Sequence, residues 1–166
     1  MNNLYLLLGS NLGDRVFYLT EAERRLSALF GKTIQKSKLY ETAAWGLEDQ
    51  PSFLNQVLVY RTGFSPRVVL ALTQRIEQEL GRIRKERWGA RVIDIDILFY
   101  GPQVIETDLL HLPHPQLHLR RFTLAPLAEV APELVHPVLQ KTISQLLEEC
   151  PDPLEVKEFL KQNYQD

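Results

Sequence analysis

Hydrophobic residues follow two different spacings along this 166-residue chain, and the changes between them predict its elements. Short apolar runs and alternation are typical of strands, whereas apolar residues recurring every three or four positions are typical of helices. Ser65-Pro66 fits a helix start, and the glycines at 31 and 81 fit helix ends. The predicted elements, in order, are a strand over 4–8, a helix over 15–30, strands over 33–42 and 53–61, a helix over 66–80 and a strand over 92–100.

The order of these elements, β-α-β-β-α-β, is that of the split βαβ arrangement. We therefore predict an α+β, ferredoxin-like fold, with an antiparallel sheet, two helices on one face and the other face open for a site. The rest of the chain is expected to extend this core. The predicted additions are a hairpin strand at 104–106 that extends the sheet, short helices over 124–130 and 142–149, and a charged amphipathic tail over 153–164.

Composition is typical of a globular protein, and we expect residues 1–166 to form a single domain. The hydrophobic content of 45% suffices for a core, and the formal net charge is -2 with a pI near 6.1. An acidic chain makes a poor general nucleic-acid surface, so no nucleic-acid partner is expected. The single Cys150 excludes an intramolecular disulfide, and no apolar run reaches the roughly 18 residues of a membrane span. These features predict a cytoplasmic protein that does not bind membranes.

Two acidic residues interrupt the last predicted strand of the core, which is otherwise apolar and β-branched. Because strand side chains alternate between faces, Asp94 and Asp96 point the same way, opposite to Ile93, Ile95 and Ile97. Their Cβ atoms should lie roughly 6.6 Å apart, two strand rises of about 3.3 Å. Two anions at that spacing repel by roughly 2.5 kcal/mol at an effective dielectric constant near 20. Solvation, a shared proton or a bound cation could relieve this repulsion.

The loop before this strand is strongly basic. Its five cations, opposed by the single Glu86, are Arg82, Arg84, Lys85, Arg87 and Arg91. Carboxylates beside arginines suit a polyphosphate bridged by Mg²⁺, because Asp oxygens take this cation and guanidinium groups clamp phosphates. Each feature alone also fits a structural role, since half-exposed strands alternate in this way and basic runs are often solvated loops. Their adjacency favours a phosphate-and-metal site.

Other polar and aromatic residues have both a structural and a functional interpretation. Asn55 is an amide on an apolar strand face, so its partners are either backbone groups or a heterocyclic ligand. Trp45 could stack on a flat ligand or cover the core, and His114 is held in a proline-fixed loop. Gly9 and Gly13 could form a phosphate-binding nest, but a bend between strand and helix is the favoured interpretation.

Several short motifs occur in order between about positions 4 and 135. They are Leu8-Gly9-Ser10-Asn11-Leu12-Gly13-Asp14-Arg15, Phe53-Leu54-Asn55, Gln74 to Glu77 with Gly81-Arg82-Ile83-Arg84, Arg87-Trp88-Gly89-Ala90-Arg91-Val92-Ile93-Asp94-Ile95-Asp96-Ile97-Leu98, and Pro113-His114 followed by Arg120 and Phe122. Together, and in this order, they resemble the signature of the 6-hydroxymethyl-7,8-dihydropterin pyrophosphokinase family, which acts in folate biosynthesis. The combination is highly specific, although no single stretch is.

The resemblance implies an ATP-dependent diphosphokinase. Such an enzyme transfers the pyrophosphoryl group of ATP to the hydroxymethyl oxygen of the dihydropterin and releases AMP. By similarity, Asp94 and Asp96 would hold two Mg²⁺ ions, and Arg82 and Arg91 would act around the transition state. The implied ATP-binding positions are Gln74, Glu77, Arg84, Arg87, Trp88, Arg91, Ile97, His114 and Arg120.

On the pterin side, the resemblance implies a pocket with aromatic faces and hydrogen-bonding edges. Phe53 stands where the family commonly has a tyrosine. The implied substrate-binding positions are Thr42, Ala43, Trp45, Phe53, Asn55, Asp94 and Phe122. ATP and the dihydropterin are the expected partners, and the protein is expected to be a monomer.

Two other classes of function use the same features. A metal-dependent phosphohydrolase or nucleotidyl transferase could use the same aspartates. A ferredoxin-like binding module could instead use the basic loop to dock an acidic partner. The products formed from ATP distinguish the first alternative from a diphosphokinase. Binding of a non-hydrolysable ATP analogue with Mg²⁺ distinguishes the second, because a docking module should not bind it.

Overall fold

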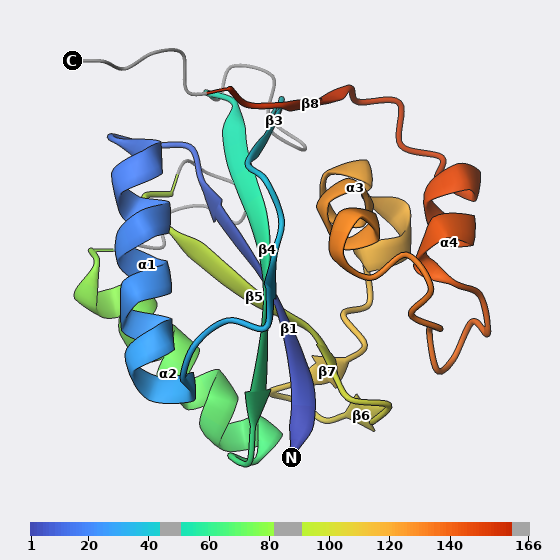
Figure 1. The fold of residues 1–166 in the computed structure, drawn as a ribbon, viewed down its shortest axis with the longest axis horizontal. Helices are drawn as coiled ribbons and strands as arrows, with labels where there is room; N and C mark the ends of the chain where they lie inside the picture. The colour runs from blue at the N-terminus through green and yellow to red at the C-terminus, as the bar shows by residue number, and fades with distance from the viewer. Residues whose placement is uncertain (44–50, 82–90, 161–166) are drawn as a thin grey trace.

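The computed structural model describes residues 1–43, 51–81 and 91–160, and it is built around one antiparallel sheet (Figure 1). The strand order is β5-β1-β4-β3-β8, and β2 also pairs with β4. The long inner strand β1 pairs antiparallel with β4 on one side and with β5 on the other. The strands of this sheet are β1 (Asn2–Ser10), β2 (Gln35–Lys36), β3 (Tyr40–Thr42), β4 (Phe53–Thr62), β5 (Asp94–Tyr100) and β8 (Val156–Glu158).

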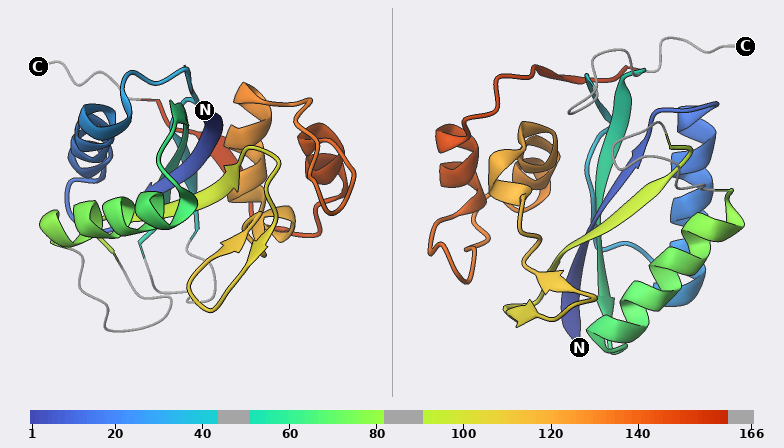
Figure 2. Two further views of the ribbon diagram at one scale, coloured as in Figure 1. Left: turned by 90° about the horizontal axis from the view of Figure 1, so that it is seen from below. Right: turned by 180° about the vertical axis from the view of Figure 1, so that it is seen from behind.

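The two long helices lie on one face of the sheet, as predicted, and shorter helices lie on the other face (Figures 1 and 2). The helices are α1 (Arg15–Phe30), α2 (Pro66–Glu79), α3 (Arg121–Val130), α4 (Ile143–Glu149) and the 3-10 helix η1 (Leu117–Leu119). The second face was expected to be open for a site, and it is open only in part, because α3 and α4 cover the rest of it. Two separate apolar cores flank the sheet, with Leu6 and Leu58 in the first and Leu7 and Val57 in the second. Because β1 and β4 are buried on both faces, β1 is a nearly continuous apolar run.

Local sequence explains where the two long helices begin. The Asp14 carboxylate accepts a hydrogen bond from the backbone N–H of Phe17, and the Ser65 hydroxyl accepts one from Val68. Each bond satisfies an N–H group that has no partner within the first turn. Gly31 ends α1 with a φ of 89°, a conformation that favours glycine. Gly13, with a φ of 73°, makes the predicted bend between β1 and α1.

Residues 33–42 form two short strands instead of the single predicted strand. Ser37 lies between β2 and β3, where its hydroxyl accepts a hydrogen bond from the backbone N–H of Val57. The Ser37 backbone N–H donates to the carbonyl oxygen of the same valine, and its own carbonyl accepts the Gln56 amide. The Ser37 hydroxyl and the Gln56 side-chain amide thus replace part of the regular backbone hydrogen-bond ladder and interrupt the strand.

The predicted hairpin forms, but it does not extend the main sheet. β6 (Ile105–Glu106) and β7 (His111–Leu112) make a separate two-stranded sheet. The chain leaves the main sheet at Gly101, whose φ is 52°. The hairpin is followed by a link back to β5, because the backbone N–H of His114 donates to the Leu98 carbonyl at 3.0 Å. Leu98 lies at an irregularity in the β1–β5 ladder and has no ladder partner there.

The C-terminal part differs from the prediction in two places. The helix expected over 124–130 begins three residues earlier, at Arg121, as α3. Within the tail expected over 153–164, Val156–Glu158 forms β8, which pairs antiparallel with β3 as an outer strand of the sheet, and residues 161–164 lie outside the described residues. Each helix in the described ranges is too short or too polar to cross a lipid bilayer.

Replacing Leu6 by alanine tests the core between the sheet and the two long helices α1 and α2. Leu6 is fully buried in the middle of β1, and Leu6→Ala leaves a cavity that should lower the free energy of unfolding by about 2–5 kcal/mol. Val104→Ala is the control, because the valine is 52% exposed and its loss should change stability by less than about 0.5 kcal/mol. Urea denaturation measures both. Equal effects of the two substitutions would contradict the described packing.

Candidate active site

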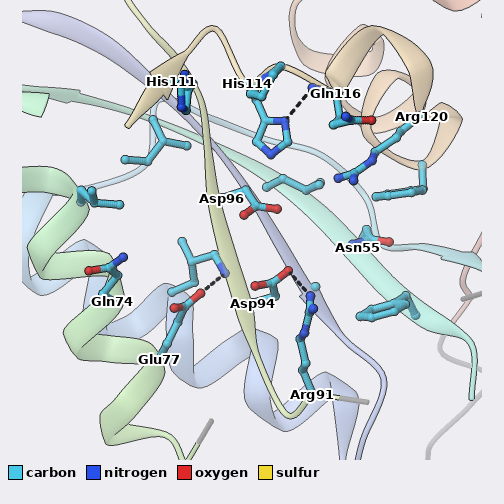
Figure 3. A pocket seen from close by; sticks show the side chains of 18 of the residues that line it. Asn55, Gln74, Glu77, Arg91, Asp94, Asp96, His111, His114, Gln116 and Arg120 are labelled. Atoms are coloured by element: carbon cyan, nitrogen blue, oxygen red, sulfur yellow. Dashed lines mark hydrogen bonds and ion pairs between the residues drawn. The ribbon is translucent and has the colours of Figure 1, made fainter. Parts of the chain in front are cut away.

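The candidate site lies where the second face of the sheet is left uncovered by α3 and α4. A cavity of about 500 Å³ opens there, and residues from several elements line it (Figure 3). Asp94 and Asn55 both lie opposite Gly9 in the strand register, so the three residues form one row across β5, β1 and β4. Asp96 lies in the next row, opposite Leu7. The register therefore puts both aspartates and the amide around the same space.

Every predicted site residue that the structure describes lines this cavity. They are Thr42, Ala43, Phe53, Asn55, Gln74, Glu77, Arg91, Asp94, Asp96, Ile97, His114, Arg120 and Phe122. Trp45, Arg82, Arg84, Arg87 and Trp88 lie outside the described residues. Segments far apart in the sequence thus meet in one cavity.

Three carboxylates surround the acidic end of the cavity. The Glu77 carboxylate extends from α2 and accepts a hydrogen bond from the backbone N–H of Ile95 at 2.7 Å, between the two aspartates (Figure 3). Burial raises the pKa of Asp96 well above its usual range, and the negative charges of Asp94 and Glu77 raise it further. The positive charges of Arg120 and Arg91 act in the opposite direction. A cation would relieve the repulsion that remains.

The donor set at this end fits Mg²⁺. The described residues contain no group of three or more His, Cys, Asp or Glu side chains arranged around a single metal position. Mg²⁺, however, is commonly held by one or two carboxylates and completes its shell with waters and substrate phosphates. Asp94 and Asp96 provide two such carboxylates in the cavity, with Arg91 forming an ion pair to Asp94 at 3.1 Å.

Asn11 fixes the position of Arg91, a role that the sequence analysis did not assign to it. Its side-chain oxygen accepts the Arg91 backbone N–H at 2.7 Å, and its own backbone N–H donates to the Arg91 carbonyl at 3.0 Å. The Asn11 amide nitrogen donates to the Pro51 carbonyl at 3.0 Å. Asn11 thereby links Arg91 to Pro51, which are far apart in the sequence. The sequence signals were its position directly after a buried strand and its place in the family-like stretch from Leu8 to Arg15.

Gly9 makes room for Asn55. A Cβ atom at Gly9 would lie 2.6 Å from the amide nitrogen of Asn55, so a larger residue would displace that side chain. Gly9 lies within β1, and the favoured interpretation of it as a bend is therefore wrong. The Asn55 amide nitrogen donates to the Leu8 carbonyl at 3.3 Å. Its buried side-chain oxygen has no hydrogen-bond partner among the described residues, which leaves an acceptor for a ligand.

His114 is a neutral imidazole in a fixed orientation. Burial lowers its pKa to about 4; the charge of Arg120 contributes to this shift, and that of Asp94 opposes it. Its Nδ1 atom accepts the backbone N–H of Gln116 at 3.1 Å, so in the neutral ring the proton is on Nε2. Figure 3 shows His114 and Arg120 across the cavity from Glu77. The imidazole can donate a hydrogen bond to a ligand without adding a charge.

Two aromatic residues form part of the cavity wall. Phe53 at the start of β4 and Phe122 in the first turn of α3 both line the cavity. The Arg120 guanidinium lies 5.7 Å from the centre of the Phe122 ring. The cavity therefore combines an acidic end, guanidinium groups and aromatic faces. Such a combination is typical of phosphate-handling sites that also bind a flat ring.

Sequence comparison identifies the family. The sequence model of the 7,8-dihydro-6-hydroxymethylpterin-pyrophosphokinase (HPPK) family matches residues 5–132. The 2-amino-4-hydroxy-6-hydroxymethyldihydropteridine pyrophosphokinase of Bacillus subtilis (strain 168) is 47% identical over 136 residues, which cover 81% of each chain. That of Aquifex aeolicus (strain VF5) is 43% identical over 146 residues, which cover 87% of this chain and 90% of the relative. The chain belongs to the 7,8-dihydro-6-hydroxymethylpterin-pyrophosphokinase family.

Solved structures support the same fold. The Plasmodium falciparum HPPK-DHPS A437G/K540E structure with pterin and p-hydroxybenzoate matches with a TM-score of 0.71 at 19% identity. The match covers 89% of this chain and 43% of that chain, so this protein spans less than half of that structural relative. At this identity the likeness concerns the fold alone. It is a mixed α/β fold with an antiparallel sheet.

The low pKa of His114 predicts a pH-dependent stability. The folded protein keeps this imidazole neutral down to about pH 4, whereas the unfolded chain takes up the proton near pH 6.5. The contribution to stability is complete above about pH 6.5 and is lost as the pH falls toward 4, by up to roughly 3 kcal/mol. His114→Gln should remove this part of the acid destabilisation. Urea denaturation at pH 7.5 and 4.5 measures it, and parallel losses in both proteins would contradict the assignment.

Proposed function

We propose that this protein transfers the pyrophosphoryl group of ATP to the hydroxymethyl oxygen of 6-hydroxymethyl-7,8-dihydropterin, giving AMP and the pterin diphosphate. The relatives that cover most of the chain carry the name of this activity. The observation that carries the proposal here is the shared cavity, in which Asp94 and Asp96 lie together with Arg91, Asn55 and Arg120. An anionic metal site, a cationic clamp and a ring-binding wall are the three parts that this reaction needs.

Asp94 and Asp96 would hold two Mg²⁺ ions. Bound there, the ions would offset the negative charge of the triphosphate and polarise the bonds that change. The high pKa of Asp96 supports this role, because a cation bound there would offset the charges of Asp94 and Glu77 and replace the proton on Asp96, which would pass to solvent. Glu77 supports the pair by fixing the Ile95 backbone between the aspartates. We assign Glu77 to the ATP side of the cavity.

The cationic groups would bind and orient the phosphates. Arg91 is held by Asn11 at its backbone and reaches Asp94 with its side chain, so it is poised beside the metal site. Arg120 extends from the start of α3 on the other side of the cavity. We assign Arg91 and Arg82 to the transition state and Arg120 to ATP, because guanidinium groups follow charge as it moves between phosphates. The assignment of Arg82 rests on the family resemblance alone.

Further ATP contacts are proposed on the same grounds. His114 would donate from Nε2, and Gln74 would contribute a neutral amide from α2. Ile97 has a buried apolar side chain beside the cavity and would pack against the nucleotide. The remaining positions assigned to ATP by resemblance are Arg84, Arg87 and Trp88.

The pterin would lie between the aromatic residues Phe53 and Phe122, with its hydrogen-bonding edge toward Asn55. The side-chain oxygen of Asn55 is buried without a partner in the described part of the chain, and a ring N–H donor would satisfy it. A pocket with such a group rejects ligands that leave it unpaired. Thr42 and Ala43 line the same end, and Trp45 is assigned to it by resemblance. Asp94 is assigned to the substrate as well as to the metal, because it lines the cavity in the same strand row as Asn55.

We further propose that the core is ferredoxin-like and that residues 1–166 act as one monomeric, cytoplasmic domain. The order β5-β1-β4, with β2 and β3 beyond β4, supports the first part, because it places the strands of a split βαβ unit in an antiparallel sheet. The pairing of C-terminal β8 with β3 supports a single domain. The single cysteine, buried at Cys150, is compatible with a reducing compartment.

The direct test mixes the protein with ATP, Mg²⁺ and 6-hydroxymethyl-7,8-dihydropterin. The expected products are AMP and the pterin diphosphate in equal amounts, separated by chromatography. ADP would indicate a simple kinase, and free pyrophosphate or phosphate would indicate a hydrolase or nucleotidyl transferase. Either result without a pterin diphosphate contradicts the proposal.

The metal assignment predicts a large effect of Asp96→Ala. Loss of one of two metal ligands should lower kcat by roughly 10²- to 10³-fold, equivalent to several kcal/mol of transition-state stabilisation. The control is Asp108→Ala, which removes an exposed carboxylate from the hairpin loop. Steady-state kinetics at saturating Mg²⁺ measures both variants. Near-normal turnover of the Asp96 variant would refute the assignment of the metal ligands.

The pterin assignment predicts that Gly9→Ala weakens binding of the dihydropterin. The new methyl group would displace the Asn55 amide, so we expect an affinity loss of about tenfold, similar to that of Asn55→Ala. Gly63→Ala is the matched control, because no atom lies within 4 Å of the Cβ position there. Calorimetric titration with the pterin measures the change. If Gly9→Ala binds like the control, Asn55 does not contact the pterin as proposed.

A further inference from the structure

The chain segment 150–159 contacts two separate walls of the active-site cavity. At one end it lies against the start of α3, where Arg120 and Phe122 line the cavity. At the other end it pairs with β3, which ends at Thr42 beside the cavity. The family match ends at residue 132, so this segment lies beyond it. None of the residues in the segment lines the cavity itself.

Asp152 supplies the N-terminal cap that α3 does not provide for itself. The residue at the cap position, Arg120, makes no side-chain capping bond. The Asp152 carboxylate instead accepts the backbone N–H of Arg121 at 3.0 Å through one oxygen. Its other oxygen accepts the backbone N–H of Leu154 at 2.9 Å, and the residue is only 3% exposed. A buried carboxylate at a helix N-terminus makes charge-assisted bonds that are stronger than neutral ones.

Arg121 completes the connection from the helix side. Its guanidinium group donates to the Asp152 backbone carbonyl at 3.2 Å and to the Cys150 carbonyl at 3.1 Å. The side chain and backbone of Arg121 therefore both bind the same short segment. Arg121 is also the residue between Arg120 and Phe122. Any shift of Arg121 along the helix start must move these two cavity-lining neighbours with it.

The second contact holds the opposite wall. The Thr42 hydroxyl donates to the Glu155 carbonyl at 3.0 Å, and Thr42 lies opposite Val156 in the register of β3 and β8. Further along, the Phe159 ring lies 5.6 Å from the Arg15 guanidinium, which in turn binds Glu41 at 2.8 Å. The segment therefore spans from α3 to β3 and fixes the spacing of the two walls.

We propose that Asp152 is a positioning residue for substrate binding in the active-site cavity. Through the first N–H of α3 and through Arg121, it fixes the places of Arg120 and Phe122 in the cavity. The inference rests on the proposed function, in which Arg120 binds ATP and Phe122 stacks on the pterin. Without the cap, the first turn of α3 loses a charge-assisted bond at its start, and both side chains lose their fixed orientation.

The test compares Asp152→Ala with the wild type in steady-state kinetics and in calorimetric titration with the dihydropterin. We expect KM and Kd for the pterin to rise about tenfold, while kcat at saturation changes less than threefold. Asp152→Asn keeps one acceptor oxygen and should show a smaller rise, of about threefold. Glu148→Ala is the matched control, because it removes an exposed carboxylate from the neighbouring α4. All assays are run well below the melting temperature of each variant.

The outcomes separate positioning from stability. A purely structural role would lower the melting temperature, or the fraction of active enzyme, and leave KM and Kd unchanged, and that result would overturn the inference. If Asp152→Ala does not fold, the same decision is made on Asp152→Asn, whose shape matches the wild type. A wild type that binds the pterin but forms no AMP would instead overturn the proposed function, and with it the inference.

Discussion

The mutual repulsion of Asp94, Asp96 and Glu77 is the physical constraint on which the site depends. Burial and the neighbouring carboxylates raise the pKa of Asp96, although the positive charges of Arg91 and Arg120 oppose this. A chain under selection for stability alone would not place three acids around one cavity. The arrangement is stabilised by the Ile95 backbone N–H at Glu77 and by the Arg91 guanidinium at Asp94. The acidic cluster therefore points to the chemistry more directly than the fold does.

The sheet register converts this local feature into a complete site. Gly9, near the end of β1, lies between Asp94 and Asn55, and its missing side chain leaves space for the amide. Beside this row, Asn11 holds the Arg91 backbone. Beyond the sheet, Asp152 caps the helix that contributes Arg120. The residues that contact ligands in our proposal are thus supported by polar groups that are themselves buried.

Some predictions from the sequence were wrong for an identifiable reason. The hairpin at 104–106 was expected to extend the sheet, and the second face of the sheet was expected to be open for a site, whereas α3 and α4 cover part of it. In both cases the local pattern was correct, because a strand forms at Ile105 and α3 and α4 are helical. What failed was the choice of packing partner. Periodicity shows which face of an element is apolar, but it does not show which other element covers that face. Gly9 was misjudged for the same reason, since its role depends on Asn55 across the sheet.

By itself the sequence determined the order of the main elements and the common orientation of Asp94 and Asp96, because both follow from the fixed periods of helix and strand. It also determined the family, because the spacing of the motifs is specific. Only the tertiary structure decided that Asn55 lies beside Gly9, that Asn11 holds Arg91 and that the C-terminal segment caps α3. These contacts join residues far apart in the chain. They depend on register and packing, which no local pattern of residues encodes.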